Sequence, residues 1–573
     1  MFRENKKHLQ PAMLSSIDAL PQRQLKRLGE SWAGVFYRET FSRLDEKPFA
    51  VLYSDKDSRP NVPVNILVGL ETLKSGFNWS DEEMYDAFTF DVQVRYALGY
   101  RILGEGDFEL RSVYNFRHRL AEHMQKTGEN LIEKSFEQIT DKQIASYQLK
   151  TAKVRMDSSQ IASNIANLSR LHLLVEVLGR VHQMLGDEDR AAYEEAFAPY
   201  VRGTSGQYVY RVKGEDGATH MQQIGELMGR LLLELADAYG QHPTYQMLKR
   251  VFSEHFVVEQ GRLRLKVGKE LSTSSLNSPD DWEATFRTKA NRSYKGYVAN
   301  VTETCEPEND LQLIVKVQTE SNTANDDDLL VEAVPSLKER LDIDEIHTDG
   351  GYNSGESYQT LRDNQINHVQ TALHGHSPQS KLGLAAFAVA TSEQGEPTAV
   401  TCPNGQRVAV AVGKGQETYL AHFAAEKCAA CPLQVDCPTV VLKRQPYRTL
   451  RFDCHAAEIA RRRQRIAEDR QKGRNLRVAI ESTIASLKAP YNYGQLPVRG
   501  KFRVNMVLLG CAAMVNVRRI HRYLTRKNTE AKVASDGKAC QGLNWTSLLF
   551  RLSSLARFIS LSSIKRCQLS AIS

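Results

Sequence analysis

The hydrophobic pattern of the first 145 residues has the period of amphipathic helices. Apolar positions recur at helical spacing in the runs 64–74, 81–97 and 113–126. Ser80 followed by Glu83 predicts a capping box that starts one helix, and Gly76 is expected to end the helix before it. Residues 1–145 are therefore predicted to form a helical N-terminal domain.

From residue 150 the pattern changes to short strand-like runs. Strands are predicted at 151–156, 294–304, 311–319 and 344–348, followed by a helix at 356–362 and a strand at 366–371. A helical insert at 163–275 separates the first strand from the second. Residues 150–374 are therefore predicted to be the first part of a mixed α/β core.

The remaining sequence divides into three segments. Residues 375–455 form a second insert that contains a cluster of cysteines. Residues 456–530 are predicted to complete the core, with a basic helical stretch at 456–488 and an apolar helix near 504–520. Residues 531–573 lose clear periodicity and are expected to be an irregular tail.

Composition narrows the class of protein only a little. A chain of 573 residues with 41% hydrophobic and 25% charged residues suits two to four ordinary globular units. The net charge of +7 would suit a polyanionic partner but does not identify one. The first residues lack the apolar centre of a signal peptide, and no run of about 20 apolar residues is present. We expect a cytoplasmic protein without a membrane partner.

Three acidic residues lie where metal-dependent phosphodiester chemistry would require them. Asp157 and Asp349 are expected at strand ends, and Glu481 on a helix. Carboxylates from separate elements can hold two divalent ions about 4 Å apart, which grip the attacking and the leaving oxygen. Each residue alone is also explained by a helix cap, a turn or a solvated helix face. Gly350 and Gly351 allow close backbone approach beside Asp349.

The stretch around Glu481 has the most specific spacing in the sequence. Arg477 is four residues before Glu481 and Lys488 is seven residues after it, so all three are expected on one helical face. Such a face is typical of a ladder of ion pairs, but it would equally place a metal ligand between two phosphate-binding cations. Periodicity does not choose between these two interpretations.

At these residues the sequence resembles the DDE transposases of bacterial insertion sequences that carry an Arg, Glu and Lys signature. The resemblance covers most of the chain and rests on the stretches SRPNVPVNILVGLETLKSG, ELRSVYNFRHRL, VRMDSS, HTDGGYNS and KAPYNYGQLPVRGKFRVNMVLLGCAAMVNVRR. The sequence departs from the pattern at Arg474, where such families often have a Tyr; an Arg there would still suit a phosphate.

The resemblance implies a ribonuclease H-like catalytic core with a mixed sheet and a DNA-binding N-terminal domain. Asp157, Asp349 and Glu481 would bind two Mg²⁺ ions, with Mn²⁺ able to substitute, while Arg477 and Lys488 would contact DNA. The implied enzyme binds the terminal inverted repeats of an insertion sequence, then cuts the DNA and transfers the strand. Its partners would be double-stranded DNA, both element ends and target, and a second copy of the chain in the complex. A nucleoid-associated location follows.

A cysteine cluster and a run of arginines offer further candidate sites. The cluster consists of Cys402, Cys428, Cys431 and Cys437, and its thiolates predict a structural Zn²⁺ site, with reduced structural thiols or an iron–sulfur cluster as alternatives. His422, Cys454 and His455 are candidate substitutes for one ligand. The arginines Arg461, Arg462 and Arg463 either form a solvated helix face or follow the phosphates of bound DNA.

Two other functions fit the same residues. A transposase-derived DNA-binding protein would keep the fold but lack the metal chemistry, and Arg474 and the unusual tail are compatible with it. A metal-dependent nuclease of the same fold would cut without joining. The complete acidic triad favours the active transposase.

Overall fold

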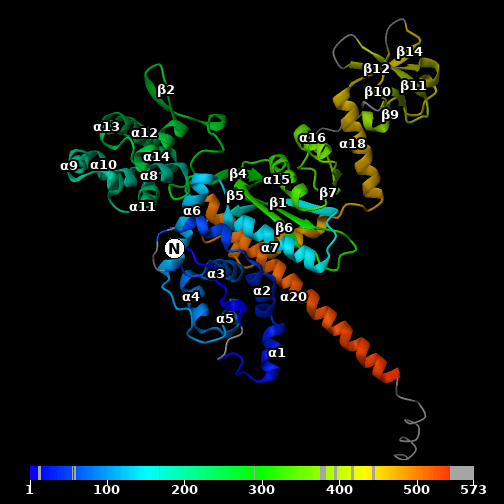
Figure 1. The fold of residues 1–573 in the computed structure, drawn as a ribbon. Helices are drawn as coiled ribbons and strands as arrows, with labels where there is room; N and C mark the ends of the chain where they lie inside the picture. Colours follow the sequence, from blue (N-terminus) through cyan, green and yellow to red (C-terminus); the bar gives the residue numbers. More distant parts are fainter. Residues whose placement is uncertain are drawn as a thin grey trace, which may run out of the picture.

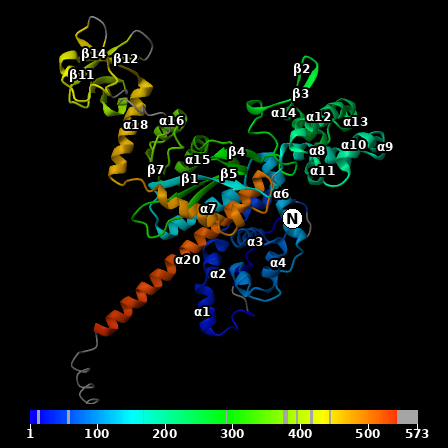
Figure 2. The same cartoon turned by 180° about the vertical axis from the view of Figure 1, so that it is seen from behind.

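The computed structural model describes residues 1–573 apart from 11–14, 55, 57–59, 167, 290, 374–381, 393–395, 414–417, 442–444 and 542–573. For residues 493 and 534–541 it describes the backbone alone. Two peripheral modules lie at opposite ends of a central body, and a long C-terminal helix crosses that body and extends beyond it (Figure 1; Figure 2).

A mixed sheet forms the centre of the molecule. Its strands are β1 (Lys153–Ala162), β4 (Thr285–Lys289), β5 (Arg292–Thr304), β6 (Ile314–Ser321), β7 (Glu345–Thr348) and β8 (Asn367–Gln370). The strands run in the order β5, β1, β7, β8, and both β6 and β4 pair with β5. β5 is antiparallel to β1, β4 and β6, whereas β1, β7 and β8 are parallel to one another.

Strand β1 is longer than its sequence pattern predicts. We expected it to end at Met156, but its pairing with β5 continues from Val154 opposite Thr304 to Ala162 opposite Gly296. The prediction was wrong because the unbroken ladder of a long partner strand keeps the polar residues after Met156 extended. Asp157 therefore lies inside the strand and not after it.

The N-terminal region is helical, and its last helix packs against β6 of the sheet. Its helices are α1 (Gln22–Glu30), α2 (Trp32–Glu39), α3 (Val64–Phe77), α4 (Asp81–Phe90), α5 (Val92–Ala97), α6 (Arg111–Thr127) and α7 (Leu131–Tyr147). The capping box of Ser80 and Glu83 is confirmed at the start of α4. The preceding helix, however, passes Gly76 and is capped by Asn78 in the left-handed conformation.

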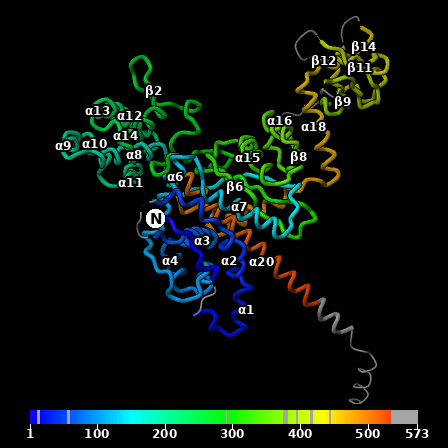
Figure 3. The backbone as a smooth tube through the Cα atoms, in the orientation of Figure 1, coloured from blue at the N-terminus to red at the C-terminus, as the bar shows by residue number. Residues whose placement is uncertain are grey.

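The long helix α20 (Lys501–Gln541) joins the N-terminal helices to the sheet. It packs against α3 on one side and β6 on the other, and one apolar core extends from Ala33 to Ile520. Figure 3 traces its straight path out of the central body. The predicted irregular tail is wrong for residues 531–541, which continue this helix; the rest of the tail lies outside the described residues.

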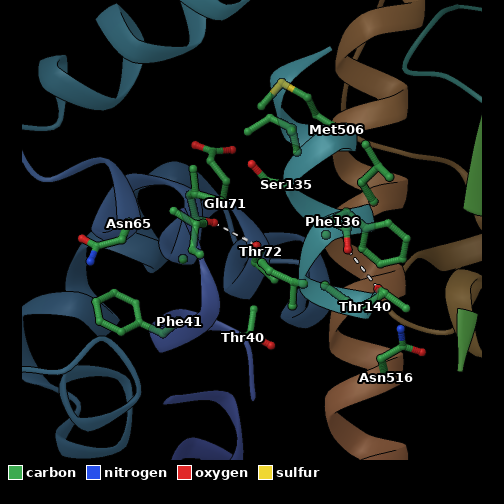
Figure 4. A pocket seen from close by; sticks show the side chains of 18 of the residues that line it. Thr40, Phe41, Asn65, Glu71, Thr72, Ser135, Phe136, Thr140, Met506 and Asn516 are labelled. Carbon is green, nitrogen blue, oxygen red and sulfur yellow. Dashed lines mark hydrogen bonds between the residues drawn. The ribbon is translucent and has the colours of Figure 1, made fainter. Parts of the chain in front are cut away.

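The junction between α3, α7 and α20 contains a cavity of about 40 Å³. Figure 4 shows Thr72 and Thr140 on its wall, where each hydroxyl donates a hydrogen bond to a carbonyl of its own helix. Two other lining residues, Thr40 and Gln143, each have a buried side-chain oxygen without a hydrogen-bond partner in the described part of the chain. The cavity is small and lies within the shared core, away from the acidic candidates.

The opposite face of the sheet is covered by α15 (Asp326–Arg340) and α16 (Gly355–Asp363). Leu330, Val334 and Leu337 of α15 form a separate core with Val154 and Met156 of β1. β1 is thus buried on both faces at its first half, which fixes the position of the residues that follow Met156.

The segment between β1 and β4 forms a peripheral helical module. Its elements are α8 (Arg170–Met184), α9 (Asp187–Ala192), α10 (Glu194–Val201), α11 (Ser205–Arg211), α12 (Gly217–Glu234), α13 (Ala236–Tyr239), α14 (Pro243–His255), β2 (Phe256–Glu259) and β3 (Arg262–Leu265). The predicted helices are accompanied by a β-hairpin, β2 and β3, that the sequence pattern did not indicate.

A second peripheral module follows β8 and is built mainly of strands. They are β9 (Ala388–Thr391), β10 (Pro397–Thr401), β11 (Arg407–Val412), β12 (Thr418–Ala424), β13 (Val440–Val441) and β14 (Tyr447–Asp453), with the short helix α17 (Ala425–Ala429). Helix α18 (Cys454–Gln471) leads from this module back to the sheet (Figure 1).

The basic stretch predicted as one helix over 456–488 is divided in the structure. α18 ends at Gln471, and after an irregular turn the chain forms a 3-10 turn at Arg477–Ala479 that continues into α19 (Ile480–Lys488). Gly473 in this turn has φ +59°, a left-handed conformation that glycine adopts without strain. The break lets α19 lie against β1 while α18 points away from it.

Candidate functional site

The acidic candidates come from two neighbouring parallel strands and one helix. The pairing of β1 with β7 places Arg155 opposite His347, and Asp157 and Asp349 each follow two residues later. Asp157 is buried, Asp349 is half-buried after the end of β7, and Glu481 is exposed in the first turn of α19. The side chains therefore meet at one edge of the sheet.

Arg477 lies among these carboxylates. Its Nη2 donates to Oδ2 of Asp157 at 2.7 Å, and its Nη1 lies 3.1 Å from Oε1 of Glu481. Burial opposes the charge of the guanidinium, but Asp157, Asp349 and Glu481 together raise the pKa of Arg477. The guanidinium of Arg477 thus interacts with carboxylates that come from β1, from the end of β7 and from α19.

Asp157 is in an environment that resists ionisation. Burial raises the pKa of its carboxyl group most strongly, the ion pair with Arg477 lowers it, and the charge of Asp349 raises it further. The net direction is upward. The cation beside Asp157 therefore favours the ionised form of this carboxyl group.

Asp326, at the N-terminus of α15, is a neighbouring acidic residue that we did not single out in the sequence. Its Oδ1 accepts a hydrogen bond of 2.5 Å from the hydroxyl of Ser158. A Cβ at Gly351 would lie 2.6 Å from Oδ2 of Asp326 and 3.0 Å from Oδ1 of Asp349, so only glycine fits between them. In the sequence, the acidic run NDDD at 325–328 could have indicated Asp326. It was not singled out because the same run is explained as the cap of α15.

Lys488 and Arg474 are placed differently from Arg477. Nζ of Lys488 donates to Ser159 Oγ at 2.6 Å and to the carbonyl of Gln160 at 2.8 Å, and burial lowers the pKa of this amine. Arg474 forms ion pairs with Glu345 and Asp469 and remains about half exposed. Lys488 thus lies against β1, while Arg474 ties the end of α18 to β7.

A buried ion network fixes α19 over the sheet. Glu303 of β5 is fully buried and accepts from Arg155 of β1 at 2.6 Å, from Thr483 of α19 at 2.8 Å and from Arg519 of α20 at 2.6 Å. Because both carboxylate oxygens are used, the network joins four elements at one point. It sets the helix that carries Glu481 against the strand that carries Asp157.

The arginines of α18 have contacts within the protein. Arg461 donates to Thr391 Oγ1 at 3.1 Å, and Arg462 pairs with Glu458 and lies 3.6 Å from the ring centroid of Tyr358. Arg461, Arg462 and Arg463 are all half-buried. This part of α18 therefore packs on β9 and α16, and it is not a fully solvated face.

The candidate cysteines lie together in the strand module. Cys402, Cys428, Cys431 and Cys437 are half-buried free thiols that line one cavity. The candidate substitutes have other surroundings: His422 contacts Thr449 at 3.0 Å, Cys454 contacts Tyr419, and His455 is exposed. Within the described residues, no three His, Cys, Asp or Glu side chains are grouped closely enough to hold a metal ion.

The three carboxylates of Asp157, Asp349 and Glu481 are of the kind that binds a divalent cation. In this structure they face the guanidinium of Arg477 instead. Three carboxylates surround a single positive charge, and hard oxygen donors are what Mg²⁺ and Mn²⁺ prefer. A divalent cation and Arg477 would therefore compete for the same oxygens. The residues that would hold the cation are Asp157, Asp349 and Glu481.

Comparison with known protein families gives a match in the C-terminal part of the chain. Residues 401–521 match the family model described as a transposase DDE domain. The match covers well under half of the chain. It includes Arg477, Glu481 and Lys488, but not the two aspartates. Among curated proteins and solved structures, no significant match was found.

Among the described residues, no helix combines the length and the apolar character needed to cross a bilayer.

Proposed function

We propose that this protein is a DDE transposase that binds the terminal inverted repeats of an insertion sequence and catalyses metal-dependent DNA cleavage and strand transfer. The observation that carries the proposal is the convergence of Asp157, Asp349 and Glu481 on Arg477. Three carboxylates that converge on one cation can bind divalent metal ions. The basic residues beside them can bind the phosphates of DNA.

The order of the strands supports a ribonuclease H-like core. Three antiparallel strands, β6, β5 and β1, are followed by the parallel strands β7 and β8. Asp157 lies on β1 and Asp349 directly follows the adjacent parallel strand β7, and helix α19 brings Glu481 from a distant part of the sequence. In this proposal residues 1–145 bind DNA and the two peripheral modules are inserts in the core.

Mg²⁺ is the proposed cofactor, with Mn²⁺ as a substitute, and it would supply an activated attacking oxygen and stabilise the leaving one. The chain's own residues prepare this site. Asp157 and Asp349 are held side by side by the pairing of β1 with β7, and the Glu303 network holds Glu481 over them. Arg477 stabilises the ionised form of Asp157 and would exchange this carboxylate for a phosphate of bound DNA.

Lys488 and the arginines of α18 extend the proposed DNA contact. Lys488 lies beside β1, at the edge where a phosphate would approach the carboxylates. Arg474 and the half-buried Arg461, Arg462 and Arg463 would reach DNA by exchanging protein partners for phosphate. We further propose that two copies act together, because two element ends must be cut in one complex, and that the enzyme works in the cytoplasm on nucleoid DNA.

The decisive experiment measures cutting and joining of a labelled DNA that carries the element's own ends, with Mg²⁺ or EDTA. We expect Asp157→Asn, Asp349→Asn and Glu481→Gln to bind the ends but neither cut nor join them. Asp310→Asn is the control, because Asp310 is an exposed partner of Arg526 and Lys527 far along α20.

Each outcome is informative. Cutting and joining by the wild type and by Asp310→Asn, but by none of the three variants, supports the proposal. End binding without cutting by the wild type would indicate a DNA-binding protein that has lost the chemistry. Hydrolysis without joining would indicate a nuclease, and full activity in any of the three variants would remove that carboxylate from the site.

A further inference from the structure

The four cysteines of the strand module face one enclosed space. Cys402 follows β10, Cys428 lies in α17, and the next two cysteines lie in the loop after α17. Together with Phe423 and Arg448 they line a cavity of about 30 Å³. A space of this size has room for a single ion.

The surroundings of these thiols favour a bound cation. Four thiolates around one space repel one another, and a cation among them removes that repulsion. The guanidinium of Arg448 lines the same space and would offset part of the remaining negative charge.

Hydrogen-bond donors already point at two of the sulfurs. The amide of Gln406 donates to Sγ of Cys402 at 3.3 Å, at a turn in which Gly405 has φ +83°. The hydroxyl of Thr439 lies 3.2 Å from Sγ of Cys437, and Thr439 is itself held by Arg448. Donors of this kind orient metal ligands and stabilise the thiolate form.

The described part of the strand module has little apolar core of its own. Its apolar core is small and separate from the cores of the central body; its buried residues are Phe387, Val389, Val400, Ala421, Phe423, Leu450, Phe452 and Ala457. The module stands apart from the sheet, connected through α18 (Figure 2). Small domains with so little buried apolar surface usually require a disulfide or a metal.

We propose that these four cysteines bind one structural Zn²⁺ ion, independently of the proposed function. On binding, each thiol releases its proton to solvent and its sulfur donates an electron pair to zinc at about 2.3 Å. The sulfurs line the cavity without yet forming a tight group, so side-chain rotation must draw them inward. With four protein ligands the site is closed to water, and its role is to cross-link β10, α17 and the following loop.

The test measures the metal content of the purified full-length protein by mass spectrometry. We expect about one zinc per chain in the wild type. Cys428→Ser and Cys437→Ser should lose most of it. Cys454→Ser is the matched control, because Cys454 is a half-buried thiol of the same module that contacts Tyr419 and lies outside the cavity.

A second measurement does not depend on how the variants fold. The wild-type protein is stripped with a chelator and titrated with Co²⁺, whose thiolate charge-transfer absorption reports the number of sulfur ligands. Saturation at one Co²⁺ with a tetrathiolate spectrum supports the proposal. Absence of that absorption, iron with acid-labile sulfide in the purified protein, or equal zinc loss in Cys454→Ser would overturn it.

Discussion

The central sheet and the helical module beside it differ in how much of the sequence contributes to their apolar cores. The core shared by the sheet and the N-terminal helices draws on residues from Ala33 to Ile520. The core of the helical module draws only on Leu171 to Leu276. The first can form only when distant parts of the chain meet, whereas the second is complete within one continuous segment.

This difference determines how far a disturbance should spread. In the sheet, one buried network joins β1, β5, α19 and α20, so damage there should loosen the carboxylate site and the N-terminal helices together. In the helical module a disturbance should remain local. The peripheral modules can therefore vary without moving Asp157, Asp349 and Glu481 relative to one another.

The largest expected effect is that of Glu303→Gln. Removing the charge leaves the guanidinium groups of Arg155 and Arg519 buried without their anion, which should cost about 4 kcal/mol of unfolding free energy. Hydrogen exchange should rise in β1, β5, α19 and α20 together. Glu308→Gln, which removes an exposed partner of Lys150, should change nothing measurable. Faster exchange confined to β5 would contradict a shared core.

A pH effect of intermediate size is expected in the helical module. Burial, with help from Arg170 and Lys266, lowers the pKa of His255 to about 4, below its ordinary value of 6.5. The unfolded chain therefore binds the extra proton first, and stability falls as the pH falls from 6.5 towards 4. At pH 5 the loss should be about 2 kcal/mol.

Hydrogen exchange across this pH range tests that expectation. His255→Gln should remove the pH dependence of α8, α12 and α14, whereas His118→Gln, at an exposed histidine of α6, should not. If the module is independent, the exchange of the central sheet should not respond to His255→Gln. An unchanged pH dependence in the variant would show that another group is responsible.

The smallest expected effect concerns Arg477 and rests on the proposed function. Arg477→Gln removes the guanidinium that occupies the oxygens of Asp157 and Glu481, so Mn²⁺ should bind the DNA-free protein about tenfold more tightly. Calorimetric titration measures this affinity without any turnover. Arg499→Gln, at an exposed partner of Asp280, is the control. Equal or weaker Mn²⁺ binding in Arg477→Gln would rule out competition.

Much of the fold could be predicted from periodicity, and the deviations have physical causes. The parallel strands ending near Asp349 and Gln370 and the capping box at Ser80 are local patterns, and all are present in the structure. The extension of β1 beyond Met156 was not predictable, because it depends on pairing with a strand more than a hundred residues away. The strands of the cysteine-containing module were not predicted either, although they pair with strands close to them in sequence.

The candidate site, like the fold, could be predicted from the sequence only in part. The sequence spacing correctly indicated that Arg477 and Glu481 are neighbours. It could not indicate that Arg477 also reaches Asp157, or that Lys488 turns to Ser159 instead of Glu481, because these contacts depend on how α19 lies on β1. Asp326 was missed because its run of acidic residues has a sufficient local explanation as a helix cap.

Helix α20 has a consequence for how the chain is made. Protein synthesis delivers α3 early, yet the apolar side of α3 is covered by residues that leave the ribosome only after position 500. During most of translation the N-terminal helices therefore expose a surface that attracts chaperones or other nascent chains. The helical module can fold as soon as its own residues have left the ribosome, whereas the first helices cannot complete their packing until α20 has been made.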